Sequence, residues 1–128
     1  MTNPTQALER FVRPKTILLT SYRRNGTSVG TPVHIAVNRE HAFVRMWDKT
    51  WKFRRIRNNP MVEIAPATWR GQPTGPASRA HARVLDGSEA LHAAHALACK
   101  YPVLHGFLIP LVHRLRDYRT VHIELTPN

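Results

Sequence analysis

The sequence contains a single cysteine, Cys99, which excludes a disulfide bond within the chain and fits a reducing compartment. It has no apolar run near the roughly 20 residues that a membrane-spanning helix needs. Residues 1–11 contain no basic stretch followed by an apolar one, so no secretory signal is expected. These absences predict a cytoplasmic protein without stable membrane insertion.

Acidic residues are also scarce. Eight Asp and Glu stand against nineteen Lys and Arg, which gives a formal net charge of +11. Such a charge attracts polyanions, for example nucleic acid, anionic lipid or a phosphorylated cofactor. A solubilising surface in a lineage that favours arginine is the alternative. Residues 45–57 hold six basic side chains and one acid, Asp48, so this segment is the first candidate for a site.

The amino-terminal half predicts a helical arm and a strand meander. The 128 residues fit one domain, in which residues 1–14 form an arm with a short helix at residues 2–12. The dipeptide Asn25-Gly26 lies between two strand-like runs, a strong signal for a β-hairpin. Together with a third run, these strands are expected to form an antiparallel meander over residues 16–22, 29–37 and 41–46.

The remaining elements complete a small β-rich fold. Helices are expected over residues 50–58, capped by Thr50, and over residues 88–101, capped by Ser88. The second helix has one apolar face, which consists of Leu91, Ala94, Leu97, Ala98 and Tyr101. Residues 103–115 are apolar but interrupted by Gly106 and Pro110, which suggests mixed helix and loop. Three further strands are predicted over residues 61–67, 76–85 and 119–126. The fold class is therefore all-β, a six-stranded closed or split β-barrel, because closure removes exposed sheet edges.

The helix at residues 50–58 combines several features that bind anions. Its first turn offers backbone amides and the positive end of the helix dipole. Thr50 adds a hydroxyl donor there, Lys52 adds an ammonium group, and the guanidinium groups of Arg55 and Arg57 can pair with oxyanions further along. On charge alone, a solvated basic face is an equally good interpretation.

Short motifs in a fixed order resemble a known family. They are Thr20, Asn25-Gly26, Gly30-Thr31-Pro32-Val33, Thr50-x-Lys52-x-x-Arg55-Ile56-Arg57-Asn58-Asn59-Pro60-x-Val62, Ala65-Pro66, Arg70-Gly71, Ala82-Arg83-Val84-Leu85-Asp86, Lys100-Tyr101 and Ile123-Glu124-Leu125-Thr126-Pro127. The pattern is similar to the pyridoxamine 5′-phosphate oxidase-like split-barrel superfamily and, more narrowly, to its branch of F420-dependent oxidoreductases.

The resemblance implies a homodimer with the cofactor in a groove at the dimer interface. It places Thr31, Pro32 and Val33 against the isoalloxazine-like ring through their backbone, and Thr50 and Lys52 on the cofactor phosphate. Arg55 and Arg57 would meet phosphate or an acidic tail. The predicted site also includes Arg45, Met46 and Trp47, where the family usually has a small, hydroxyl-bearing sequence. The rings of Trp47 and Trp51 could stack on the cofactor ring or occlude it.

The charge favours F420 over FMN, because F420 carries a phosphodiester and a polyglutamate tail. The predicted function is hydride transfer between reduced F420 and a small unsaturated or aromatic acceptor. An FMN-binding protein, a non-catalytic F420 carrier and a basic single-stranded nucleic-acid-binding barrel are the alternatives. Nucleic acid is not the expected partner, because the basic residues gather around one short helix and aromatic residues make up only 8% of the chain. No residue is assigned as acid, base or nucleophile.

Several other residues have two interpretations. Trp69 and Arg70 could reach the cofactor or simply cover one end of the barrel. The apolar residues 107–112 favour dimer or core packing over a peripheral membrane contact, which Arg114, Arg116 and Arg119 could support. His92 and His95 lie three residues apart on one predicted helix and could share a ligand. The other histidines lie on different elements and no cysteine or carboxylate cluster completes a shell, so no metal site is predicted. Cys99 is expected to be a small core residue.

Overall fold

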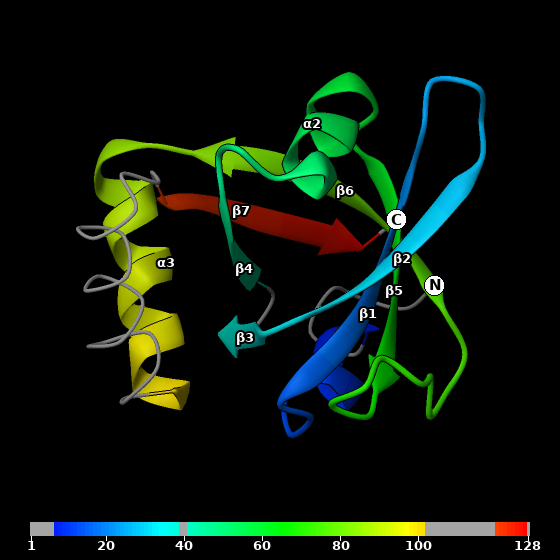
Figure 1. Ribbon diagram of the computed structural model, residues 1–128. Helices are drawn as coiled ribbons and strands as arrows, with labels where there is room; N and C mark the ends of the chain where they lie inside the picture. Colours follow the sequence, from blue (N-terminus) through cyan, green and yellow to red (C-terminus); the bar gives the residue numbers. More distant parts are fainter. Residues whose placement is uncertain (1–6, 39–40, 102–119, 128) are drawn as a thin grey trace.

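The computed structural model describes residues 7–38, 41–101 and 120–127. Within these residues, seven strands form one antiparallel sheet with the order β2-β1-β5-β6-β7-β4-β3 (Figure 1). The elements, in chain order, are η1 (Glu9–Phe11), β1 (Thr16–Tyr22), β2 (Ser28–Val33), β3 (Ile35–Asn38), β4 (His41–Trp47), α2 (Trp51–Asn58), β5 (Met61–Ala67), β6 (Ser78–Leu85), α3 (Gly87–Lys100) and β7 (Thr120–Pro127).

The predicted hairpin is confirmed, but the predicted strand count was wrong. Gly26 has φ of +88°, a backbone conformation that suits glycine, and the amide of Arg23 donates to the Thr27 carbonyl across the turn at 2.9 Å. The strand expected over residues 29–37 breaks at His34, so six predicted strands become seven. Its first half, β2, pairs with β1, and its second half, β3, pairs with β4.

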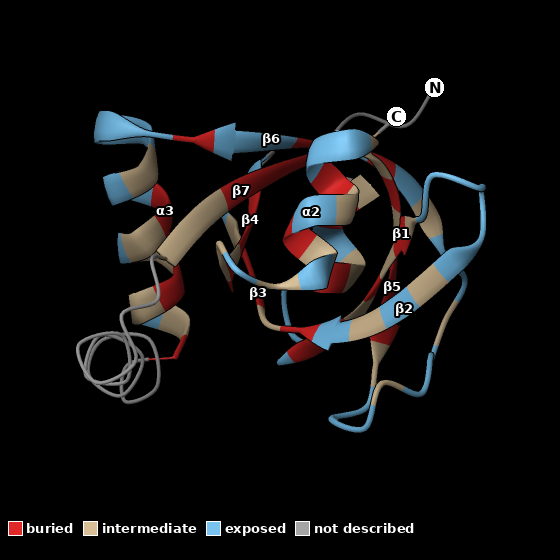
Figure 2. Ribbon diagram, turned by 45° about the horizontal axis from the view of Figure 1, so that its top comes forward, coloured by how far each residue is buried: buried red, intermediate tan, exposed pale blue. Residues whose placement is uncertain are grey.

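This break explains how the sheet closes. β2 and β3 are the two edges of the seven-stranded sheet, yet only His34 separates them in the chain. The sheet therefore curls until both edges meet at one segment, and its strands contribute most of the buried core, whose residues are red in Figure 2. β2 and β3 each pair with one neighbour, so the sheet curls toward a barrel without a hydrogen-bonded ladder between its two edge strands.

Two apolar clusters hold the fold together. The larger fills the barrel with side chains from the strands, and it includes Phe53 and Ile56 of α2 and Phe11 of η1. α2 thus covers one end of the barrel, while the segment of η1 lies toward the other end (Figure 1). The smaller cluster packs α3 onto the outside of the sheet and contains Ala36, Phe43, Leu85, Ala93, Leu97 and Tyr101.

The prediction for α3 needs three corrections. Its N-cap is Asp86, not Ser88. Leu91, expected on the buried face, is 73% exposed, because Ala93 and Leu97 are the residues that face the sheet. Cys99 is also exposed, not a core residue. Leu97 and Tyr101 of the expected apolar face do pack on the sheet, but Ala93, and not Leu91 or Ala94, completes that face.

The amino-terminal helix is only partly described. The described helical residues begin at Ala7 and end with η1 at Phe11, within the predicted span of 2–12. The start of the predicted helix at residues 2–6, the apolar segment 107–112 and the arginines at 114, 116 and 119 lie outside the described residues. Among the residues that are described, no helix is long and apolar enough to cross a membrane.

Candidate functional site

The start of α2 follows the sequence prediction. Thr50 is extended and non-helical, with φ of −83° and ψ of 151°, and its hydroxyl oxygen accepts the amide of Phe53 at 3.4 Å. The same hydroxyl donates to the Trp47 carbonyl at 2.8 Å. The hydroxyl was expected to donate to a bound anion, but its hydrogen is already engaged. Thr50 therefore fixes the connection between β4 and α2, and the amides of Trp51 and Lys52 are left as the first-turn donors of the helix.

Five predicted site residues come together at this point. A cavity of about 340 Å³ lies elsewhere on the sheet, but a smaller one of about 200 Å³ is lined by Arg45, Met46, Trp47, Thr50 and Lys52. We refer to the smaller one as the β4–α2 cavity. Met46 is only 3% exposed and belongs to the barrel core. The side chains that can contact a ligand at this cavity are therefore those of Arg45, Trp47 and Lys52.

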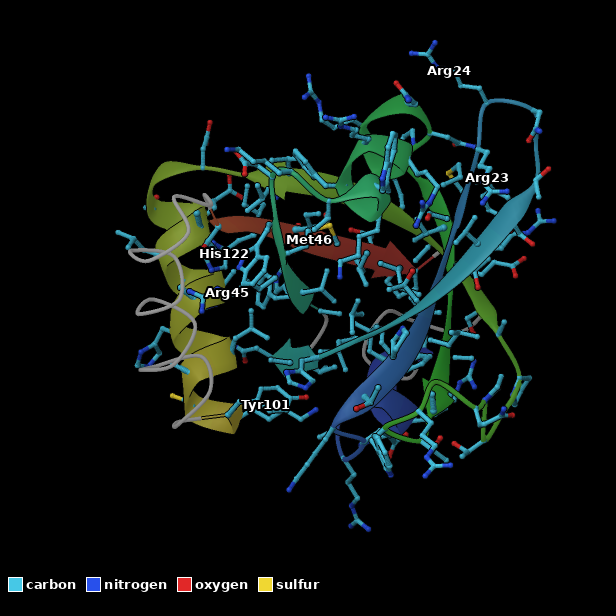
Figure 3. All side chains as sticks on the ribbon, viewed as in Figure 1. Arg23, Arg24, Arg45, Met46, Tyr101 and His122 are labelled. Atoms are coloured by element: carbon cyan, nitrogen blue, oxygen red, sulfur yellow. The ribbon has the colours of Figure 1, made fainter. Side chains whose placement is uncertain are left out.

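Burial changes the basic groups of the β4–α2 cavity. Burial, and then the charge of Arg55, lower the pKa of Lys52. Burial also lowers the pKa of Arg45. The Arg45 guanidinium donates through Nε to Nε2 of His122 at 3.3 Å, and Figure 3 shows both side chains on the α3 side of β4. Partly desolvated cations interact more strongly with an anion than cations in open water do.

Arg55 and Arg57 do not line the β4–α2 cavity. A second hollow of about 550 Å³ is lined by Arg23, Arg24, Trp51, Arg54, Arg55 and Asn58. A third hollow, of about 360 Å³, shares Arg24, Arg54 and Asn58 with it and adds Arg57. We call these two together the hairpin groove, because one wall is the tip of the β1–β2 hairpin and the other is α2.

Sequence reasoning missed half of the hairpin groove. Arg23 and Arg24 directly precede the Asn25-Gly26 turn, and in Figure 3 Arg24 extends from the hairpin tip toward α2. Arg55 links the two walls, because its Nε donates to the buried Ser21 hydroxyl of β1 at 2.7 Å. The two arginines beside the turn were visible in the sequence, but nothing in it indicated that the tip of the hairpin lies beside α2.

The predicted ring-binding residues lie at another place. Thr31, Pro32 and Val33 are on β2, where they pair with Leu19, Leu18 and Ile17. Val33 is buried in the barrel core. The loop after β5 packs beside them, since a Cβ built on Gly71 would lie 3.5 Å from the Pro32 ring. The residues lining the β4–α2 cavity do not include these three.

Trp69 and Arg70 lie in the same loop as Gly71. Trp69 is 76% exposed, and the Arg70 guanidinium carbon lies 4.8 Å from the centre of its ring. So exposed a ring does not seal the end of the barrel. The other interpretation, contact with a ligand, stays a prediction.

The described histidines form pairwise contacts. His41 contacts Glu124, His92 contacts Asn38, and His34 stacks on Tyr101 with ring centres 4.6 Å apart. In the described part of the chain, no group of three His, Cys, Asp or Glu side chains could hold a metal ion.

Comparison with known proteins identifies the fold. No protein-family model and no curated protein matches the sequence. The heme storage protein HutZ of Vibrio cholerae superposes with a TM-score of 0.70 at 17% identity, covering 99% of this chain and 92% of that one. A Bacteroides thetaiotaomicron protein assigned to 5-nitroimidazole antibiotic resistance gives 0.69 at 10% identity, covering 96% and 79%. An F420 reductase gives 0.58 at 20% identity, covering 94% and 92%.

The chain therefore has the fold of the pyridoxamine 5′-phosphate oxidase-like, FMN-binding split-barrel proteins. Proteins of this fold include F420 reductases and heme-binding proteins as well as oxidases. At these sequence identities, the similarity shows the fold alone.

Proposed function

We propose that this protein is a homodimeric F420-dependent oxidoreductase, which passes hydride from reduced F420 to a small unsaturated or aromatic acceptor. The observation that carries the proposal is the β4–α2 cavity, where Arg45 and Lys52 face a space of about 200 Å³ at the start of α2. That space suits one oxyanion group such as a phosphate, and too little room remains for a flavin-sized ring. The ring must therefore lie outside the cavity.

The residues of this chain fit the phosphate end of such a cofactor. Lys52 contributes a point charge, Arg45 a guanidinium that His122 holds in place at 3.3 Å, and α2 the amides of its first turn. Trp47 offers a flat apolar surface at the mouth of the same cavity. The bound deazaflavin would supply the hydride chemistry, while the protein orients it and neutralises its charge.

The ring and the acceptor would use residues of β2 and the loop after β5. These residues are Thr31, Pro32 and the exposed Trp69, none of which lines the β4–α2 cavity. A second copy of the chain would bring one copy's β2 beside the other copy's cavity, which is why the proposal includes a homodimer. No described side chain is assigned a proton-transfer role.

F420 is favoured over FMN by charge. The net charge of +11 suits a phosphodiester and an acidic tail better than a single phosphate monoester. Similarity to an F420 reductase at 20% identity is consistent with this choice. A non-catalytic F420 carrier would use the same cavity, so a binding measurement alone does not distinguish the two.

The test is a fluorescence titration with F420, FMN and hemin side by side. We expect F420 to bind most tightly. Lys52→Ala should weaken it about tenfold or more, since a hydrogen bond to a charged group contributes about 1.5–3 kcal/mol. Lys15→Ala removes the same charge from an exposed residue away from α2 and should leave the affinity unchanged.

Other outcomes have clear meanings. Tighter binding of FMN or hemin would replace F420 as the cofactor, and binding of none of the three at micromolar concentrations would end the proposal. If F420 binds, oxidation of its reduced form by added acceptors separates an enzyme from a carrier. Sedimentation of the bound protein tests the homodimer.

A further inference from the structure

The hairpin groove is a strongly basic, two-sided feature that the proposed cofactor site does not use. Trp51, Arg54, Arg55 and Asn58 recur at the spacing i, i+3, i+4 and i+7, so they share one side of α2. Arg23 and Arg24 form the opposite wall. The side chains of six residues from two elements far apart in the sequence therefore face one space.

Most of the described residues that line the hairpin groove are arginines, and none of them carries a carboxylate. These arginines repel one another. Burial lowers the pKa of Arg55, and the positive charge of Arg23 lowers it further. An anion in the groove would relieve that repulsion. Guanidinium groups pair with phosphate oxygens in a forked geometry, so several arginines can hold more than one phosphate group.

The hairpin groove also offers an aromatic surface and an amide. Trp51 is 70% exposed, and the Arg54 guanidinium carbon lies 4.8 Å from the centre of its ring. A nucleobase can stack on such a ring or on the guanidinium plane. The side-chain amide of Asn58 can both donate and accept a hydrogen bond. The edge of a nucleobase can use both groups, whereas a carboxylate can only accept from the NH₂ group.

We propose that the hairpin groove binds a nucleotide, with its base on Trp51 and Arg54 and its phosphates on Arg23, Arg24 and Arg57. This second site is distinct from the β4–α2 cavity, since the two share no lining residue. The proposal stands on its own and holds even if the protein binds no F420.

A free nucleotide fits the hairpin groove better than a nucleic-acid strand does. The groove consists of two adjoining hollows that share Arg24, Arg54 and Asn58, so its charge is confined to the hairpin tip and one short helix. Strand-binding proteins instead line a long groove with charge and several aromatic platforms. The stacking surface within the groove is Trp51.

Calorimetric titration with ATP and with inorganic triphosphate tests the proposal, because the two share a chain of three phosphates and only ATP has a base. We expect ATP to bind at least about fivefold more tightly, from one stacked base. Trp51→Ala should remove that preference and leave triphosphate binding unchanged. Arg24→Ala and Arg57→Ala should weaken both ligands, and Arg13→Ala, which removes an exposed arginine just after η1, should weaken neither.

Three results would overturn the proposal. Equal affinity for ATP and triphosphate in the unaltered protein would mean that the hairpin groove recognises charge alone. Affinity for oligothymidylate that exceeds that for ATP and rises with length would indicate a strand-binding surface. Displacement of ATP by F420, but not by FMN, would assign the groove to the acidic tail of the cofactor. Circular dichroism of each variant checks that it is folded.

Discussion

The two sides of α2 present the same kind of charge in different surroundings. At the β4–α2 cavity, burial lowers the pKa of Lys52 and of Arg45, and the space is about 200 Å³. At the hairpin groove, Arg23, Arg24 and Arg54 are exposed, and the larger hollow is about 550 Å³. A confined, partly desolvated pair of cations suits one fixed oxyanion, whereas an open row of guanidinium groups suits a longer ligand.

One short helix supports both sides. The buried pair Phe53 and Ile56 anchors α2 in the barrel core, and Thr50 sets its start. The remaining residues of the helix then point to one side or the other by their spacing alone. Both proposed binding sites therefore depend on the few contacts that hold α2 in place. The substitutions below either remove one of these contacts or alter one site alone.

Phe53→Ala should have the largest effect, because it removes the anchor common to both sides. Loss of a buried phenylalanine typically costs about 3–5 kcal/mol, measured here as the free energy of unfolding in urea. The affinities for F420 and ATP should fall together. Phe53→Leu should restore most of both. If one ligand keeps its full affinity in Phe53→Ala, the two sides do not share this support.

Exchanging single cations should separate the two sides. Lys52→Ala is expected to weaken F420 binding about tenfold or more. ATP binding should stay within about twofold, because Lys52 does not line the hairpin groove and solvent ions screen its charge. Arg54→Ala should show the reverse pattern. A parallel loss of both ligands in either variant would mean that the cavity and the hairpin groove form one continuous site.

A pH titration should sharpen the same contrast with a smaller effect. The pKa of Lys52 is lowered from 10.5, so its ammonium group loses its proton at a lower pH than that of an ordinary lysine, and F420 affinity should fall as the pH rises toward 10.5. Guanidinium groups stay charged over that interval, so ATP affinity should change much less. Lys52→Arg should abolish the pH dependence of F420 binding; if it persists there, another group is responsible.

The same lowered pKa of Lys52 has an opposite effect on stability. Between the folded and unfolded pKa values, the unfolded chain binds more protons than the folded one. The contribution of Lys52 therefore makes the free energy of unfolding rise with pH in that interval. Comparing urea midpoints of the unaltered protein and Lys52→Met over the same pH range isolates this contribution.

Thr50→Ala should give the smallest effect, about 1 kcal/mol, the usual cost of losing an N-cap. The hydroxyl contacts both Trp47 and Phe53, so its loss frees the first turn. We expect a lower melting temperature and modest weakening of F420, with ATP affected less because its arginines lie further along the helix. Thr50→Ser keeps the hydroxyl and should behave like the unaltered protein.

Much of the fold could be predicted from local sequence signals. The Asn25-Gly26 hairpin, the alternating strands at residues 16–22 and 61–67, and the N-cap of α2 all depend on neighbours in the chain. The break at His34 could not be predicted, since it arises because β2 and β3 pair with different strands. The exposed positions of Leu91 and Cys99 depend on which stripe of α3 meets the sheet, which is also a tertiary property.

Five of the predicted site residues lie together, but the sequence did not indicate that the basic residues of α2 divide between two hollows. Arg45, Met46, Trp47, Thr50 and Lys52 do meet at one cavity. Arg55 and Arg57 belong to the hairpin groove, because their positions on α2 turn them away from β4. Arg23 and Arg24 were missed because they lie far from α2 in the chain, and only the tertiary fold brings the hairpin tip next to α2.

The single segment that joins both edges of the sheet also constrains the order of folding. β7 lies between β6 and β4, and it is the last strand in chain order. The hairpins β1–β2 and β3–β4 can form from local contacts as soon as their residues are available, whereas the sheet cannot become continuous until residues 120–127 pair with strands laid down far earlier. Until β7 pairs with both β6 and β4, the other described strands form two separate ladders, β2-β1-β5-β6 and β4-β3, which the chain joins only at His34 and through α2.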